Sequence, residues 1–168
     1  MTRIHALLIG LVALCLSACA SVQRLDAAAD VHALLISIRD NDQATFEAHI
    51  DRKALKQELQ AKLEKSIGSD KRLSGFAALL GPSVIEFAGD SLLQPRVFKL
   101  VAQSYGYTPQ TRIPNQVEIA AVIKPLPDGR VCATSKKDGP CLLVFTKQQG
   151  VWRLTSFEGD ASMLRLKL

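Results

Sequence analysis

The chain has 168 residues, of which 48% are hydrophobic and 22% charged, and its formal net charge is +5. The part of the chain from residue 19 onward suits one domain with one core, and it has no internal repeats or low-complexity segments. Residues 19–94 carry 9 Lys and Arg against 11 Asp and Glu, whereas residues 95–168 carry 11 against 5. The basic half can attract anionic headgroups, cell-wall polymers or an acidic partner, although a solvated surface is the simpler interpretation. Nucleic acid is not an expected partner, because aromatic and basic residues do not alternate as they do in single-strand binders.

Residues 1–18 have the pattern of a lipoprotein signal peptide. Arg3 precedes an apolar stretch over 6–16, and Leu16-Ser17-Ala18-Cys19 places small residues before a cysteine. The stretch is about half of the ~20 residues that a membrane-spanning helix needs. We therefore expect cleavage before Cys19, diacylglycerol and a fatty acid on that cysteine, and a membrane-tethered domain. An ordinary secretory signal is the alternative. The residue after the cysteine is Ala20. In lipoproteins of Gram-negative bacteria, aspartate at this position favours retention in the inner membrane. By that resemblance, alanine implies an outer-membrane lipoprotein that faces the periplasm.

After a lipidated tether over 19–26, residues 27–104 are expected to be helical. Apolar residues recur at helical spacing over 31–38, and every four residues over 55–67. Asp40-Asn41-Asp42 interrupts the first helix and can cap a short second one, and Asp51 is a good N-cap for a third. The segment 73–89 is nearly uncharged, which favours burial, and Pro95 can begin a short helix that ends near Gln103.

Residues 115–168 are expected to form a sheet. Alternation predicts a strand over 117–123, a turn follows over 125–129, and Cys141–Thr146 predicts a central strand. Lys147–Gly150 predicts a tight hairpin, and Val151–Phe157 the returning strand, with Trp152 and Leu154 on one face. Residues 164–168 could form an edge strand or a tail. The expected fold is therefore α+β, with N-terminal helices on one face of an antiparallel sheet of about four strands.

Cys132 and Cys141 remain as an even pair once Cys19 is acylated. In an oxidising periplasm such a pair favours a disulfide, here between the flanks of the polar loop 135–140. A metal or redox pair is the alternative, but the chain places no histidine nearby and has no C-x-x-C.

A family resemblance follows from three segments: Ile38–Asp42, Phe46, and Ile50–Lys56. They resemble the opening of a bacterial family known only as domain of unknown function two-nine-three-nine. Phe76–Ala88, Gln94–Val97 and Val151–Thr155 take the places of its later elements. The resemblance implies a small envelope-associated α+β domain and brings no activity with it.

No catalytic residue is predicted. His32 and His49 lack a second ligand at i+4, and motifs for metalloproteases, serine hydrolases and P-loops are missing from the sequence. Asp40, Asp42 and Asp51 lie where helix caps are wanted, although a carboxylate pair across a cleft could cleave glycosides. Trp152 is expected in the core rather than as a ligand platform. Four cations could line an anion-binding patch: Arg96, Lys99, Arg112 and Arg153.

Three functions fit these features. The first is a non-catalytic lipoprotein that binds a protein or envelope partner without a cofactor or metal. The second is an immunity or inhibitor lipoprotein whose loop 135–140 blocks a toxin or a cell-wall hydrolase. The third is a cavity protein for a small apolar ligand, with a pocket lined by Leu79, Phe87, Val144 and Trp152.

Overall fold

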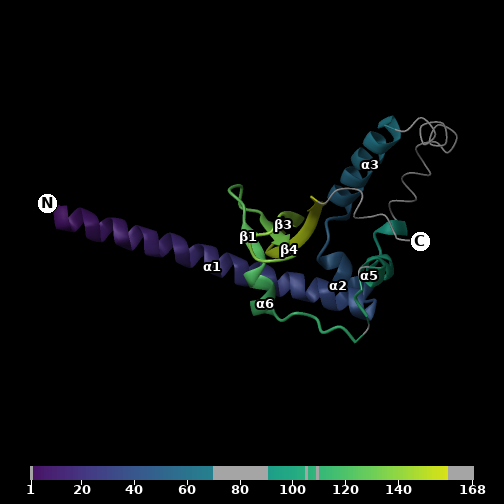
Figure 1. Ribbon diagram of the computed structural model, residues 1–168, viewed down its shortest axis with the longest axis horizontal. Coiled ribbons are helices and arrows are strands. Elements are labelled where there is room, and N and C mark those ends of the chain that lie inside the picture. The colour runs from purple at the N-terminus through teal and green to yellow at the C-terminus, as the bar shows by residue number, and fades with distance from the viewer. Residues whose placement is uncertain (1, 70–90, 105, 109, 159–168) are drawn as a thin grey trace.

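The computed structural model describes residues 2–69, 91–104, 106–108 and 110–158, with side chains from residue 20 except at 63–69 and 104. Helices come first and strands last, in the order α1 (Thr2–Asp40), α2 (Gln43–Ala48), α3 (Arg52–Ser69), α5 (Pro95–Ser104), α6 (Gln116–Ala121), β1 (Ile123–Pro125), β2 (Val131–Thr134), β3 (Cys141–Gln148) and β4 (Val151–Phe157). Figure 1 shows α1 projecting beyond the domain at its N-terminal end, while the sheet lies across its middle. The segment 73–89 and the tail 164–168 lie outside the described residues.

The expected tether over 19–26 is instead part of α1. Its last residues already contact the sheet, because Gln23 Nε2 donates to the Gly129 carbonyl at 3.0 Å and Asp26 accepts from Trp152 and Lys147. Gln23 and Asp26 thus already contact the domain that was expected over residues 27–168. These contacts were missed because they join residues more than a hundred positions apart in sequence.

The helix caps are confirmed. α1 ends at Asp40, and Asn41 takes a positive φ of 56°. Asp42 caps α2 by accepting from the Thr45 N–H at 3.1 Å, and Asp51 accepts from the Ala54 N–H at 3.0 Å at the start of α3. Each carboxylate satisfies one of the amide groups that a helix N-terminus leaves without an internal partner.

The four strands form one antiparallel sheet in the order β1-β2-β3-β4. The predicted tight hairpin joins β3 and β4, with Gly150 at a positive φ of 88° as expected. Lys147 and Gln148 still belong to β3, so the turn consists of Gln149, at φ 52°, and Gly150. Two consecutive positive φ angles are typical of the type I′ turn, whose twist matches that of the strands. Trp152 and Leu154 share the buried face of β4, as expected.

One predicted strand is wrong. Residues 116–121 form the short helix α6, and only the last part of the predicted segment, from Ile123, is extended. Asn115 and Glu118 form a capping box, in which each side chain binds the backbone N–H of the other. This local arrangement favours a helix. α6 then buries Ile119 and Ala120, whereas Val117 stays 71% exposed.

The core lies between the helices and one face of the sheet, which confirms the α+β arrangement. α1 contributes Val31 and Leu34, α2 contributes Phe46, and the sheet contributes Phe145 and Leu154, all at most 6% exposed. Phe46 also meets the ring of Phe98 from α5 edge-on, with centroids 5.1 Å apart. Apolar burial of this kind is the main stabilising contribution.

Candidate functional site

The outer edge of β4 is bound by residues from α1, α3 and the segment between α2 and α3. Leu154 donates to the His49 carbonyl and accepts from the Asp51 N–H, each at 2.9 Å, in a short parallel pairing. The Phe157 N–H donates to the Glu58 carboxylate at 3.0 Å, and Lys62 donates to the Phe157 carbonyl. These contacts cover much of an edge that would otherwise pair with another chain.

Trp152 is joined to α1 by two carboxylates. Its indole Nε1 donates to Asp26 Oδ2 at 2.8 Å, and its backbone N–H donates to Asp30 Oδ2 at 2.7 Å. Lys147 also donates to Asp26 at 2.6 Å and lies 5.8 Å from the centre of the indole ring. The pKa of Asp26 is lowered from its ordinary value because Lys147 and then Trp152 stabilise the carboxylate. Trp152 is only 2% exposed, in agreement with a core role.

Asp26 and Asp30 were missed by sequence reasoning, although the sequence held a signal. Two carboxylates four residues apart on one helix repel each other unless something else binds them. This repulsion is small, so the spacing is a weak signal and does not say which groups bind the two carboxylates. Those groups lie in β3 and β4, more than 115 residues further along the chain.

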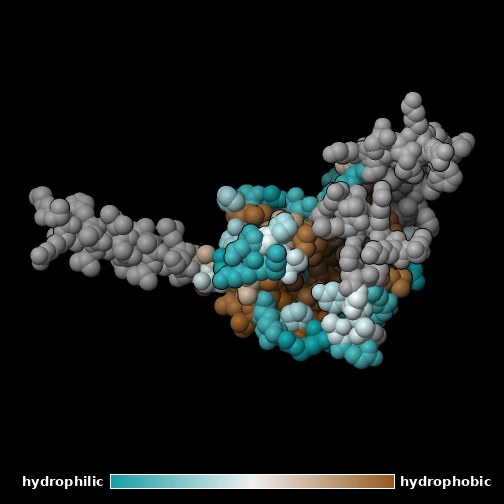
Figure 2. All heavy atoms as spheres, in the orientation of Figure 1, coloured by the Kyte–Doolittle hydropathy of each residue, from teal (hydrophilic) through white to brown (hydrophobic). Residues whose placement is uncertain are grey.

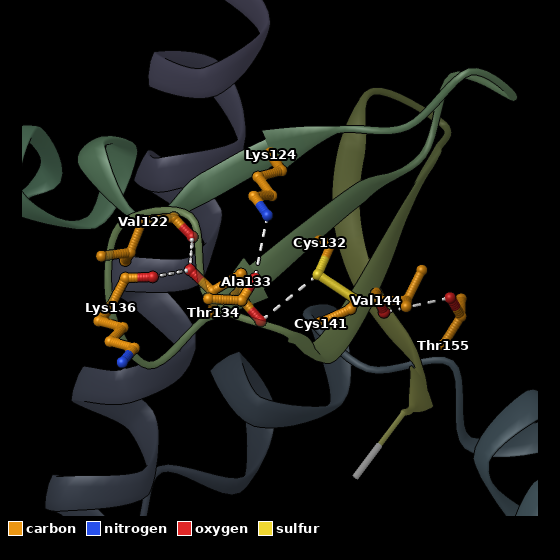
Figure 3. The surroundings of a disulfide bond; sticks show 10 residues. Val122, Lys124, Cys132, Ala133, Thr134, Lys136, Cys141, Val144 and Thr155 are labelled. Carbon is orange, nitrogen blue, oxygen red and sulfur yellow. Dashed lines mark hydrogen bonds between the residues drawn. A yellow bond between two sulfur atoms is a disulfide. The ribbon is translucent and has the colours of Figure 1, made fainter.

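Cys132 and Cys141 form a disulfide bond, in agreement with the expected pairing. Their Cα atoms lie 5.6 Å apart, and the bond closes the β2–β3 loop at its base (Figure 3). Cys132 is 1% exposed. It lies on the sheet face opposite Val131, which belongs to the main core, because neighbouring strand residues point to opposite faces.

Side-chain hydrogen bonds hold the loop as well. Figure 3 shows Thr134 Oγ1 between two carbonyls, those of Val122 at 2.9 Å and Lys136 at 2.7 Å. Lys124 Nζ, from β1, donates to the Gly139 carbonyl at 2.9 Å. Lys136 and Lys137 are both exposed. The disulfide-closed loop (residues 135–140) is therefore a fixed surface projection that presents two lysines.

The proposed cation patch does not form as one group in the contacts of the described residues. Lys99 Nζ donates to the Arg39 carbonyl at the end of α1, and Arg112 binds Glu118 through two nitrogens at 2.8 and 2.6 Å. Arg153 lies on β4 near Asp51, whose pKa is lowered mainly by a hydrogen bond from Gln148 and least by the charge of Arg153. Arg96 is exposed on α5, which Figure 1 places well away from α6. Arg96 and Lys99 share α5, whereas Arg112 precedes α6 and Arg153 lies on β4.

His49 and Asp40 have structural partners. His49 Nδ1 donates to the Thr45 carbonyl at 2.7 Å, and its Nε2 lies 3.5 Å from Asp30 Oδ1. Asp40 binds Arg39 on the surface. His32 Nδ1 is buried without a hydrogen-bond partner, although the residue as a whole is partly exposed. Among the residues that the structure describes, no group of three His, Cys, Asp or Glu could hold a metal ion.

Two further predictions depend on positions that the structure describes only in part. Cys19 lies within α1, and among the described residues no helix is long and apolar enough to cross a membrane. Of the four residues expected to line a ligand cavity, Val144 and Trp152 are buried at 1% and 2% exposure. Leu79 and Phe87 lie outside the described residues.

Comparison with known proteins identifies a family. No curated protein and no solved structure matches the chain. One family model does match, over residues 7–100, and its description is "protein of unknown function (DUF2939)". The match includes α2, the caps at Asp42 and Asp51, and the start of α5, and it covers more than half of the 168 residues. The chain therefore belongs to the DUF2939 family, as its resemblance indicated.

Proposed function

We propose that this protein is a lipoprotein of the bacterial outer membrane that faces the periplasm and binds a protein or envelope partner without catalysing a reaction. The Cys132–Cys141 disulfide carries the proposal. Disulfides persist in oxidising compartments and are rare in the bacterial cytosol. The disulfide therefore supports export, which the signal pattern before Cys19 also predicts.

The same disulfide supports a binding role. A partner that docks on a fixed loop need not order it first, and that entropic cost otherwise weakens association. Lys136 and Lys137 give the disulfide-closed loop a positive charge, which suits an acidic protein or an anionic envelope polymer. The non-catalytic role is supported by the capping functions of Asp42 and Asp51, since a cap already engages these carboxylates.

Mass spectrometry of the protein purified from its host tests the anchor. The mature chain should begin at Cys19 and carry the added mass of diacylglycerol and a fatty acid. Globomycin should leave the signal segment attached, and Cys19→Ser should release the domain from the membrane fraction. A chain that still begins at Met1 without globomycin, or a Cys19→Ser protein that stays with the membrane, would contradict the anchor.

Charge reversal tests the binding surface. The double variant Lys136→Glu, Lys137→Glu should lose a partner that co-purifies with the wild type from envelope extract. Lys53→Glu, Arg96→Glu is the matched control, because it changes the same charge at two exposed positions on α3 and α5. Equal recovery of the partner with both double variants would exclude the disulfide-closed loop as its binding site.

Inhibition of a toxin or cell-wall hydrolase is a second candidate, favoured by the rigidity of the disulfide-closed loop. Such a loop can fill an enzyme's cleft with little loss of entropy. A gene for a secreted toxin beside this one would support the hypothesis. Protection from that toxin should then be lost in the Lys136→Glu, Lys137→Glu variant and kept in the control variant.

A further inference from the structure

Apolar side chains are exposed where α1 enters the domain. Val22 and Leu25, one helical turn apart on α1, are 66% and 50% exposed, and Val117 on α6 is 71% exposed. α6 packs against α1, where Ala27 and Ala28 share a buried cluster with Ile119. Figure 2 shows hydrophobic surface in this region, beside the projecting helix. We name the three residues Val22, Leu25 and Val117 the anchor-proximal face.

The position of this face along α1 limits what can cover it. A helix rises about 1.5 Å per residue, so Leu25 lies about 9 Å along the axis from Cys19. The headgroup region on each side of a bilayer is about 5–8 Å thick. If Cys19 carries the lipid, Val22 and Leu25 cannot lie far from the headgroups at any tilt of the helix.

The charges around the face also suit a lipid surface. No acidic residue lies between Cys19 and Leu25, and Arg24 is exposed. The nearest carboxylate in sequence, Asp26, binds Lys147, and Glu118 beside Val117 binds Arg112. These pairs neutralise the two carboxylates that would otherwise repel anionic lipids.

We propose that the anchor-proximal face lies against the bilayer, with Val22, Leu25 and Val117 at the boundary between headgroups and acyl chains. The proposal rests on the proposed lipidation of Cys19. It adds an orientation: α1 lies along the membrane surface on this face, and the disulfide-closed loop projects from the sheet at a fixed place relative to it. Burial of the three apolar side chains would supplement the lipid anchor, as apolar residues do in helices that lie in the interface.

Fluorescence quenching tests the orientation in the lipidated full-length protein. Each of three variants, Leu25→Trp, Val117→Trp and Leu100→Trp, is reconstituted with vesicles of phosphatidylethanolamine and phosphatidylglycerol that have brominated acyl chains. Leu100, on α5, is 59% exposed and serves as the control. The native Trp152 is 2% exposed and gives a constant background. The bromines should quench the tryptophans at positions 25 and 117, whereas position 100 should match the wild type.

The outcomes separate the two proposals. Protein that fails to float with the vesicles would refute the anchor itself. Protein that floats, but shows no more quenching at 25 and 117 than at 100, would overturn the orientation and leave the anchor intact. A detergent-solubilised dimer that Leu25→Ser dissociates would assign the face to a second copy and would also overturn the orientation. Flotation with quenching at both positions supports it.

Discussion

Removal of the disulfide is the perturbation whose magnitude follows most directly from the structure. Replacing Cys132 and Cys141 by alanine opens a loop with a sequence separation of 9. The loop-closure model gives roughly 2.5 kcal/mol of lost stability at 25 °C for a loop of this length, because the unfolded chain gains freedom. Thr134 and Lys124 hold the loop by bonds that do not involve sulfur. We therefore expect a folded protein with a lower free energy of unfolding.

Urea denaturation followed by Trp152 fluorescence measures this loss. Dithiothreitol should destabilise the wild type by the same amount and leave the double alanine variant unchanged. Cys19→Ser controls for the loss of a cysteine outside the loop. A loss below about 0.5 kcal/mol, the range of ordinary surface substitutions, would refute the reasoning. A further loss of stability when dithiothreitol is added to the double alanine variant would also refute it.

Three further changes test the contacts around α1 and α6. Trp152→Phe should lower the free energy of unfolding, measured in urea, by roughly 2 kcal/mol, because it removes ring volume and the hydrogen bond to Asp26. Asp26→Asn keeps an acceptor for that bond and should cost less. Equal losses for the two variants would contradict this role of the bond between Trp152 and Asp26. Asn115→Ala should cost roughly 1 kcal/mol through loss of the cap, and Asn115→Asp far less, by the same assay. Arg112 and the Asn115 N–H lower the pKa of Glu118 from its ordinary 4.5 to about 2. The ionised Glu118 therefore stabilises the fold above pH 4.5, and this contribution is lost as the pH falls towards 2. The stability difference from Glu118→Gln should shrink over that interval, and a constant difference would rule out this linkage.

Local sequence signals were sufficient for the caps and the hairpin. Asp42 and Asp51 precede apolar-periodic segments, and the capping bond that each makes is to an amide three residues away. Gln149-Gly150 lies between two strand-like segments, and a two-residue turn depends on little beyond its own backbone angles. Such features are predictable because the interacting groups are close in sequence.

The segment 115–121 shows where a local pattern misled. The alternation of apolar residues predicted a strand. The capping box at Asn115 and Glu118 is a local signal for a helix, and the prediction gave more weight to the alternation. Burial of Ile119 and Ala120 in the same cluster as Ala27 and Ala28 then favours the helix, whereas a strand would send consecutive residues to opposite faces. The short length of α6 made its periodicity ambiguous.

The sequence by itself determined the order of helices and strands, the cysteine pair and the family, because each depends on residue types at short spacings. Tertiary structure alone decided that Asp26 and Asp30 bind Trp152, and that Lys99, Arg112 and Arg153 each interact with a different part of the fold. These features join groups that the folded core brings together across distant parts of the chain, and no local pattern encodes which groups will meet.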